Sequence, residues 1–274
     1  MSENEDRVRT SFEAEGVALL TVSGPPPNPS TFACVDQLAD QLERARDDGA
    51  RVVVIASDVP GYWLGHASLA DLTALFRGEE TSGTGAGFFR ASDLLAKSEL
   101  VSIAAISGDC GGGGCELGWA CDLRVAEKQA RFTQMEILAG LIPGLGGIAR
   151  LSKLIGRAIT SEIVLDGAVV SAPRLYELGA INRVVEEGRA TDVAVAWAKR
   201  LADRPAAALA LAKKVLSETQ DLPLSEALAN EQRHFQKIAA TPEAMGLMDE
   251  IQAQYDAGVI PPRVLVDPFD PEGE

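Results

Sequence analysis

A run of four glycines, Gly111–Gly114, has the residue types in this chain that are best suited to chemistry. Glycines lack a Cβ, so their backbone N–H groups can approach a ligand closely. A helix-compatible segment begins with Cys115, and the first turn of a helix adds unpaired N–H donors and the positive end of the helix dipole. The run predicts a turn that holds an oxyanion or a phosphate, with Glu116 within a turn of it.

Two glutamates, Glu116 and Glu136, lie in surroundings too apolar for ordinary surface positions. Glu116 precedes Leu117, and Glu136 stands between Met135 and Ile137. Burial in apolar surroundings raises the pKa of a carboxyl group and suits it to general acid or base catalysis. The alternative is a solvated helix face, which is the usual place for a glutamate in a chain with 40 acidic residues. From the residues alone both alternatives stay open.

A dinucleotide site is the main competing use of the glycines. Gly111–Gly118 contains no G-x-G-x-x-G, and the run lacks the Lys-Ser/Thr ending of a phosphate loop. Gly144–Ala149 does fit G-x-G-x-x-A, with Asp166 at a suitable distance for binding a ribose. Pro143, however, interrupts the strand that should precede this turn. We therefore favour a tight turn followed by a helix.

Histidine and cysteine usage argues against two further kinds of site. His66 and His234 are the two histidines, and no G-x-S-x-G elbow accompanies them, so a Ser-His-Asp triad is disfavoured. We predict that His66 is a loop residue near the site and that His234 lies on a helix surface. The four cysteines form no C-x-x-C pair, which predicts buried free thiols and no metal site.

Composition and charge restrict the partners. The net charge of −15 argues against binding nucleic acid or an acidic membrane surface. No apolar run approaches the ~20 residues of a membrane helix, and the start, MSENEDRVRT, is too acidic for a signal peptide. We expect a cytoplasmic protein.

The elements that must position the glycines and glutamates alternate between strand and helix. Val17–Val22 and Arg51–Ser57 predict strands, and Cys34–Arg46 between them predicts an amphipathic helix, which together indicate an α/β fold. The glycine run follows a predicted strand at Ile103–Ile106. Residues 78–87 predict a mobile surface loop. From about Asp192 onward the pattern is helical almost throughout.

Taken together, these motifs resemble the signature of the enoyl-CoA hydratase/isomerase (crotonase) family. The recognisable part covers roughly residues 50–186. The matching segments are Ile103–Leu117, Cys121–Ala126, Phe132–Ile137, Gly140–Gly147 and Leu178–Asn182.

The resemblance implies a crotonase-like spiral of ββα units with a C-terminal helical region. We place a flexible tail at residues 1–10, the spiral catalytic core at 11–200, a helical trimerisation region at 201–260 and a second tail at 261–274. The family implies homotrimers or dimers of trimers. It also implies an acyl-CoA thioester as substrate, with coenzyme A carried as part of that substrate and no separate cofactor.

The family's oxyanion hole carries over to two backbone N–H groups. The second donor is the backbone N–H of Gly113. The first donor lies in the loop that has the family form F-S-A-G-A-D-L. Alignment of this loop places the donor at Ala67, and an alignment shifted by one residue places it at His66. Gly65, His66 and Gly112 are the implied substrate-binding residues, with the Gly65 carbonyl facing the adenine.

The resemblance also assigns roles to the glutamates. Glu116 is expected to orient and deprotonate a water, and Glu136 to exchange the proton at Cα, which together hydrate an enoyl-CoA. Isomerisation of the double bond, thioester hydrolysis, a non-catalytic assembly role and, last, a dinucleotide oxidoreductase are the alternatives.

Three departures bear on the carrier of the acyl group. Ser68 replaces the usual Asp, the loop GPPPNPS lacks a basic residue, and Met248–Gln252 lacks the family's Phe and Lys. A carrier-protein-bound acyl group is therefore a variant of the proposal. Arg90, Lys97 and Lys153 are candidate substitutes for the missing cations.

Overall fold

The structure is a computed structural model that describes residues 7–259. The described chain divides into two compact units, one that ends at Ala206 and one that begins at Ala207. Each is described by itself. Every residue proposed for the site from the sequence lies in the first unit.

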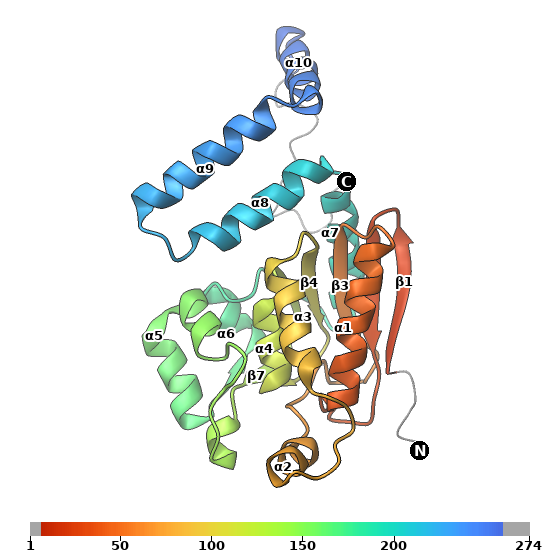
Figure 1. The fold of residues 1–274 in the computed structure, drawn as a ribbon, viewed down its shortest axis with the longest axis vertical. Coiled ribbons are helices and arrows are strands. Elements are labelled where there is room, and N and C mark those ends of the chain that lie inside the picture. The colour runs from red at the N-terminus through yellow and green to blue at the C-terminus, as the bar shows by residue number, and fades with distance from the viewer. Residues whose placement is uncertain (1–6, 260–274) are drawn as a thin grey trace. The chain divides into compact units, whose positions relative to one another are not determined.

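A six-stranded sheet forms the framework of the first unit (Figure 1). Its strand order is β1-β2-β3-β4-β6-β9, with β1 antiparallel to β2 and the other neighbours parallel. The inner strands are almost entirely buried apolar runs, as expected for parallel strands covered on both faces. Their bounds are β1 Val8–Ala14, β2 Val17–Val22, β3 Val52–Ser57, β4 Val101–Ile106, β6 Leu123–Glu127 and β9 Arg183–Val185.

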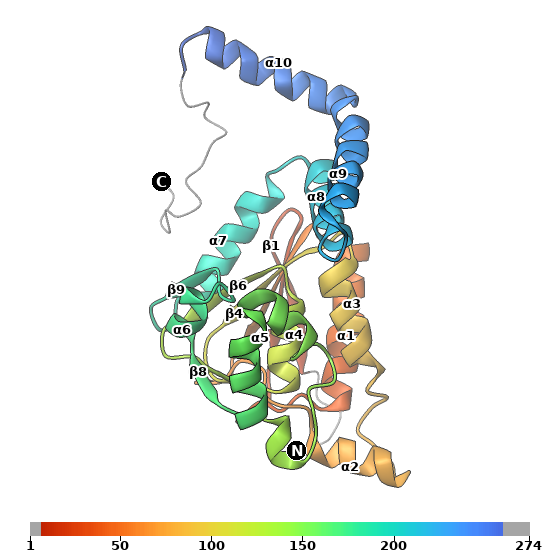
Figure 2. The same cartoon turned by 90° about the vertical axis from the view of Figure 1, so that its left-hand side faces the viewer.

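Helices cover both faces of this sheet (Figure 2). Helices α1 (Phe32–Asp47) and α3 (Ala86–Lys97) lie side by side on one face, and α7 (Ala190–Ala202) packs on the other. α7 repeats a buried alanine every fourth residue, which lets its backbone approach the strands closely. This stripe begins at Ala190 and ends at Ala202.

A second, three-stranded sheet holds the strands that precede the glycine turn and Glu136. It consists of β5 (Cys110–Gly111), β7 (Arg131–Thr133) and β8 (Val169–Ser171), with β5 parallel to β7 and β7 antiparallel to β8. Helix α4 (Gly113–Ala120) begins directly after β5, and the short helix η1 (Glu136–Ala139) follows β7. Pairing of the two strands therefore brings the glycine run beside the segment that carries Glu136. Helices α5 (Ala149–Asp166) and α6 (Ala172–Glu177) complete this region.

The second unit is helical. It contains α8 (Ala206–Thr219), α9 (Leu224–Ala239) and α10 (Pro242–Asp256). The Thr241 side chain caps α10 by accepting from Ala244 N, with Pro242 in the first turn, as the sequence predicts. His234 of α9 lies 3.3 Å from Glu218 of α8.

The structure corrects two predicted boundaries. β1 begins at Val8, which pairs with Val22, so the predicted tail of residues 1–10 already contributes to the sheet. The predicted end of the core at residue 200 falls inside α7, because the alanine stripe of that helix packs on the sheet to its last turn. The predicted tail at 261–274 lies outside the described residues.

A buried arginine ties α4 to the sheet. The Arg124 guanidinium on β6 donates to Ala180 O at 2.6 Å, Cys121 O at 2.6 Å and Gly118 O at 3.2 Å. Two of these carbonyls belong to the C-terminal end of α4, where a cation also meets the negative end of the helix dipole. Arg124 thereby fixes the helix that begins at Gly113.

We predict that Arg124→Met lowers the free energy of unfolding by about 2 kcal/mol, because buried carbonyls lose their donors. Arg131→Met is the matched control, since Arg131 pairs with Asp109 at the surface and its loss should change stability little. Urea denaturation of the two variants measures the difference. Equal stabilities would contradict the role of Arg124.

Candidate active site

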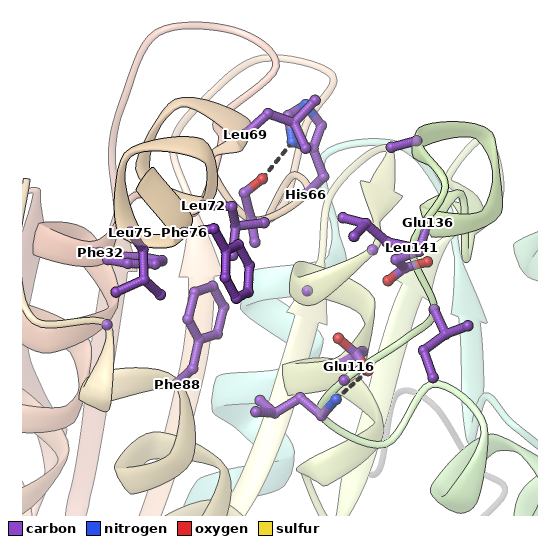
Figure 3. A pocket seen from close by; sticks show the side chains of 18 of the residues that line it. Phe32, His66, Leu69, Leu72, Leu75, Phe76, Phe88, Glu116, Glu136 and Leu141 are labelled. Atoms are coloured by element: carbon purple, nitrogen blue, oxygen red, sulfur yellow. Dashed lines mark hydrogen bonds between the residues drawn. The ribbon is translucent and has the colours of Figure 1, made fainter. Parts of the chain in front are cut away.

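The site is a cavity of about 820 Å³ in the first unit (Figure 3). Gly112 and Gly113 line it, together with Glu116 and Glu136, and Figure 3 shows the two carboxyl groups. One wall comes from the start of α1, from α2 (Leu69–Arg77) and from the start of α3. The opposite wall is the segment from Met135 to Leu145. Both walls are mainly apolar.

The backbone leaves the Gly113 N–H available to a ligand. Its neighbours are all engaged: Gly111 N donates to Leu64 O, Gly112 N to Thr133 O and Gly114 N to Gly65 O. Within the described residues the Gly113 N–H has no acceptor, as expected at the first position of α4. Gly112 has a φ of 46°, which turns the chain into the helix.

The Ala67 N–H lies beside this donor. Ser30 N donates to His66 O and Ser68 N donates to Ser30 O, both at 3.0 Å, so the Ala67 N–H points away from Ser30. A Cβ added to Gly113 would lie 3.4 Å from Ala67 N. The described chain offers Ala67 N–H no acceptor either. The two predicted donors are therefore adjacent, and the register favours Ala67 over His66 as the first.

Gly65 differs from its predicted role. Its carbonyl accepts from Ser30 Oγ and from Gly114 N, both at 3.1 Å. Both lone pairs are thus used inside the protein, and Gly65 is absent from the cavity wall. The expectation that this carbonyl faces the adenine is corrected. His66 does line the cavity, where its Nδ1 lies 2.8 Å from Ala67 O.

Glu116 is buried and held by two backbone donors. Its Oε1 accepts from Leu145 N at 2.6 Å and from Gly147 N at 2.9 Å. These contacts fix the carboxylate at the cavity edge, where Figure 3 shows a dashed hydrogen bond to Glu116. They also argue against a dinucleotide site, because two N–H groups of the turn that fits G-x-G-x-x-A, those of Leu145 and Gly147, donate to Glu116 and are not free to bind a phosphate.

Glu136 is half-buried at the start of η1 and has an altered pKa. Burial raises the pKa of its carboxyl from 4.5 to about 7, and the nearby charge of Glu116 acts in the same direction. A Cβ on Gly112 would lie 3.3 Å from Glu136 Oε1, so this carboxyl stands against the glycine turn. At neutral pH it can both donate and accept a proton.

Gln134 is a site residue that sequence reasoning missed. Its amide is buried between Trp119 and Glu136. When the amide is oriented so that its oxygen accepts from Trp119 Nε1 at 3.0 Å, its nitrogen donates to Glu136 Oε1 at 3.0 Å. Trp119 in turn stacks on Phe132 of β7. The sequence offered one indication of this role: Gln134 directly follows β7 and precedes Glu136 by two residues.

One of the sequence departures has a local explanation, and the candidate cations have partners of their own. Ser68 caps α2 by accepting from Asp71 N at 3.1 Å. Arg90 pairs with Asp40 and Glu43, and Lys97 pairs with Asp93, which leaves neither poised for a substrate phosphate. Lys153 is also partnered. Among the described residues that line the cavity there is no lysine or arginine.

The remaining expectations concern thiols, metals and membranes. All four cysteines are buried and free, which confirms that prediction. Across residues 7–259 no group of three His, Cys, Asp or Glu side chains is placed to hold a metal ion. Over the same range no helix has the length and apolar character needed to cross a membrane.

Comparison with known proteins shows the family of the chain. The model of the family described as "Enoyl-CoA hydratase/isomerase" matches residues 13–253. A "Probable enoyl-CoA hydratase" of Mycolicibacterium paratuberculosis is 35% identical over 228 residues, covering 81% of this chain and 86% of the relative. Another of Rhizobium meliloti is 32% identical, with 84% and 89% covered.

Solved structures show the same fold. The enoyl-CoA hydratase from Bacillus anthracis has a TM-score of 0.81 at 22% identity, covering 90% of this chain and 96% of that one. A structure of DspI from Pseudomonas aeruginosa has a TM-score of 0.78 at 26% identity, with 88% and 98% covered. Both likenesses extend over nearly the full length of the solved chains.

The raised pKa of Glu136 predicts a pH-dependent stability. The folded chain binds this proton more tightly than the unfolded chain, so Glu136 penalises folding increasingly as pH rises from 4.5 to about 7. Glu136→Gln removes the penalty. We expect its stability advantage over the unmodified chain to grow between pH 5 and pH 8, by no more than about 3 kcal/mol. An advantage that is the same at both pH values, measured by denaturant unfolding, would contradict the raised pKa.

Proposed function

Because the chain belongs to the enoyl-CoA hydratase/isomerase family, we propose that it adds water across the 2,3 double bond of an α,β-unsaturated acyl-CoA thioester. The observation that carries the proposal is the pair of carboxyl groups, Glu116 and Glu136, which line the same cavity as Gly112 and Gly113 of the glycine turn. Hydration needs one group that takes a proton and one that gives a proton. Coenzyme A enters as part of the substrate, and the step uses no other cofactor.

The thioester oxygen is proposed to bind between Ala67 N–H and Gly113 N–H. Both donors are unoccupied within the described residues and adjacent in space. The carbonyl of each donor's peptide is itself hydrogen-bonded, His66 O by Ser30 N and Gly112 O by Glu116 N, which polarises the N–H groups and fixes their direction. Preorganised donors of this kind stabilise the negative charge that the oxygen gains in an enolate-like state.

The two glutamates then divide the proton transfers. Glu116, oriented by Leu145 N and Gly147 N, takes a proton from water as the water oxygen bonds to C3. The double-bond electrons move to the thioester oxygen, and the enolate collapses as Glu136 gives its proton to C2. The net change is the addition of one water, and proton exchange with solvent resets both carboxyl groups. A pKa of about 7 suits Glu136 to the acid step.

Several properties stay predictions. The cytoplasmic location and the lack of nucleic-acid and membrane partners are predicted from composition and charge. The homotrimer or dimer of trimers, and the choice of coenzyme A over a carrier protein, are predicted from the family resemblance. Hydration of crotonyl-CoA compared with crotonyl-pantetheine tests the last of them. An equal kcat/KM for the two thioesters would show that the nucleotide of coenzyme A contributes nothing to recognition.

We predict that Glu136→Gln lowers kcat for hydration of crotonyl-CoA by at least ~100-fold, because the amide cannot supply the proton to C2. The dissociation constant for butyryl-CoA should change little, since the substitution preserves shape. Loss of absorbance of the conjugated thioester measures turnover, and calorimetry measures binding. Glu177→Gln, an exposed partner of Arg174 on α6, is the control and should keep full activity. Full activity of the Glu136→Gln variant would contradict the mechanism.

The pH profile separates hydration from isomerisation. Hydration needs protonated Glu136, so kcat/KM for crotonyl-CoA is expected to fall as pH rises through about 7. An isomerase would need ionised Glu136 to remove a proton from C2, and its rate would rise over the same range. A rising profile, together with conversion of a 3-enoyl-CoA, would replace hydration by isomerisation as the function.

A further inference from the structure

The indole of Trp119 meets the amide of Gln134 in a buried position next to the cavity. Trp119 lies on α4 and is 6% exposed, and Gln134 directly follows β7 and is 1% exposed. The indole stacks on Phe132 of β7, with ring centroids 5.7 Å apart. A Cβ on Gly147 would lie 2.7 Å from Gln134 Cδ, so the amide is enclosed on that side as well. Both polar groups must therefore find their hydrogen-bond partners within the protein.

The chemistry of the indole determines which way the amide points. An indole N–H donates and cannot accept, so the amide atom that faces it must be the oxygen, 3.0 Å from Trp119 Nε1. The amide nitrogen then faces Glu136, at 3.0 Å from Oε1 and 3.3 Å from Oε2. The opposite orientation would bring donors together at Trp119 and oxygens together at ionised Glu136. Trp119 thus fixes a one-way chain of donors that runs through Gln134 and ends at the Glu136 carboxyl.

This chain of donors restricts the position of the acid proton on Glu136. The backbone N–H of Glu136 also donates to its own carboxyl. Neither that N–H nor the Gln134 N–H can accept a proton, so the O–H of the protonated acid has no partner in either of them. The carboxyl lines the cavity, which is where its proton can find an acceptor. A turned amide would instead present its oxygen to the O–H and draw the proton away from a substrate.

We propose that Trp119 is a positioning residue, which acts through Gln134 to keep the acid proton of Glu136 directed into the cavity. The inference rests on the proposed function, in which Glu136 gives that proton to C2. Trp119 is not among the residues that line the cavity, so its effect on turnover passes through other side chains. A hydrogen bond donated to a carboxylate favours the ionised form, so the chain of donors also restrains the rise in the Glu136 pKa that burial causes.

The charged groups around Glu136 come from α4, α5 and the loop before α2. Glu116 on α4 raises the Glu136 pKa by charge repulsion, and Arg150 on α5 attracts the charge of Glu116. Asp166 at the end of α5 is exposed, so water and salt screen its charge. His66, from the loop, lines the same cavity. Replacing the indole alters none of these groups, so a shift in the Glu136 pKa reports the orientation of the amide.

The kinetic test is hydration of crotonyl-CoA by Trp119→Phe. Phenylalanine keeps a ring that can stack on Phe132 but removes the N–H, which frees the Gln134 amide to turn. We expect kcat at pH 6 to fall about tenfold with KM nearly unchanged, because the turned amide holds the proton that C2 needs. The pH at which kcat/KM falls should rise by about one unit, since the turned amide also stabilises the neutral acid.

Trp63→Phe is the matched control. The Trp63 indole is fully buried and its N–H donates to Ile55 O at 3.1 Å, so this substitution also removes one buried hydrogen bond. We expect a similar loss of stability in urea for Trp63→Phe and Trp119→Phe, with a shifted pH profile in Trp119→Phe alone. An equal shift in both variants would make the effect a general one of loosened packing, which overturns the inference.

A double substitution shows whether Trp119 acts through the amide. Gln134→Met keeps the length of the side chain and removes both of its hydrogen bonds. On that background, Trp119→Phe is expected to change neither kcat nor the pH profile any further. The same tenfold loss on both backgrounds contradicts the inference, and so does a Trp119→Phe variant with unchanged kcat and unchanged profile.

A measurement without substrate separates the inference from the proposed function. The chain has three tryptophans, so Phe substitutions of Trp63 and Trp197 identify the indole N–H signal of Trp119 in the NMR spectrum. This signal is expected to shift with pH as Glu136 ionises, around its pKa of about 7. The shift should disappear in Glu136→Gln and in Gln134→Met.

The outcomes of the NMR titration are distinct from those of the activity assay. A Trp119 signal that does not titrate, or that still titrates in Gln134→Met, overturns the inference even where hydration is found. No hydration of any enoyl-CoA, with a Trp119 signal that titrates through Gln134, overturns the proposed function and supports the chain of donors.

Discussion

Parallel pairing of β5 with β7 is the interaction on which the site depends. The two strands match Cys110 with Phe132 and Gly111 with Thr133, and the chain leaves each strand toward the cavity. One exit becomes the glycine turn and α4, and the other becomes the segment that carries Gln134 and Glu136. A hydrogen bond from Gly112 N to Thr133 O extends the ladder by one residue. A shift of register would therefore move the proposed oxyanion donor, Gly113 N–H, relative to the proposed acid, Glu136.

Hydrogen bonds around the glycine run occupy the backbone N–H groups that could otherwise bind a ligand. In the glycine run, Leu64 O, Thr133 O and Gly65 O accept from three of the four N–H groups, so the remaining Gly113 N–H has a defined direction. Glu116 does the same for the turn before α5, where its Oε1 accepts from Leu145 and Gly147. That contact orients the carboxylate and also closes an anion site that the sequence alone suggests. Four glycines thus produce one ligand donor rather than a general phosphate loop.

The fold was predictable where one local pattern determined one element. The strand Val17–Val22 has the predicted bounds, and the cap at Thr241 lies where Thr and Pro placed it. The crotonase fold was accessible because several motifs occur in order. β5 and β7 were not predictable, since strands of two and three residues carry no periodicity and depend on pairing across the chain. The Gly65 carbonyl and Gln134 were misjudged or missed for the same reason: their roles are set by partners distant in sequence.

The charge pattern of the cavity follows from the chemistry proposed for it. A lysine or arginine beside the oxyanion donors would stabilise an enolate, but it would also stabilise ionised Glu136 and lower the pKa of that acid. Backbone N–H groups avoid this conflict, because their partial charges act over a short range and in one direction. Burial and the negative charge of Glu116 raise the Glu136 pKa and outweigh the backbone hydrogen bond that lowers it, and the described residues that line the cavity include no lysine or arginine. In the proposed mechanism, a cavity with apolar walls, two neutral donors and two acids therefore keeps one acid partly protonated near neutral pH while the donors bind the developing anion.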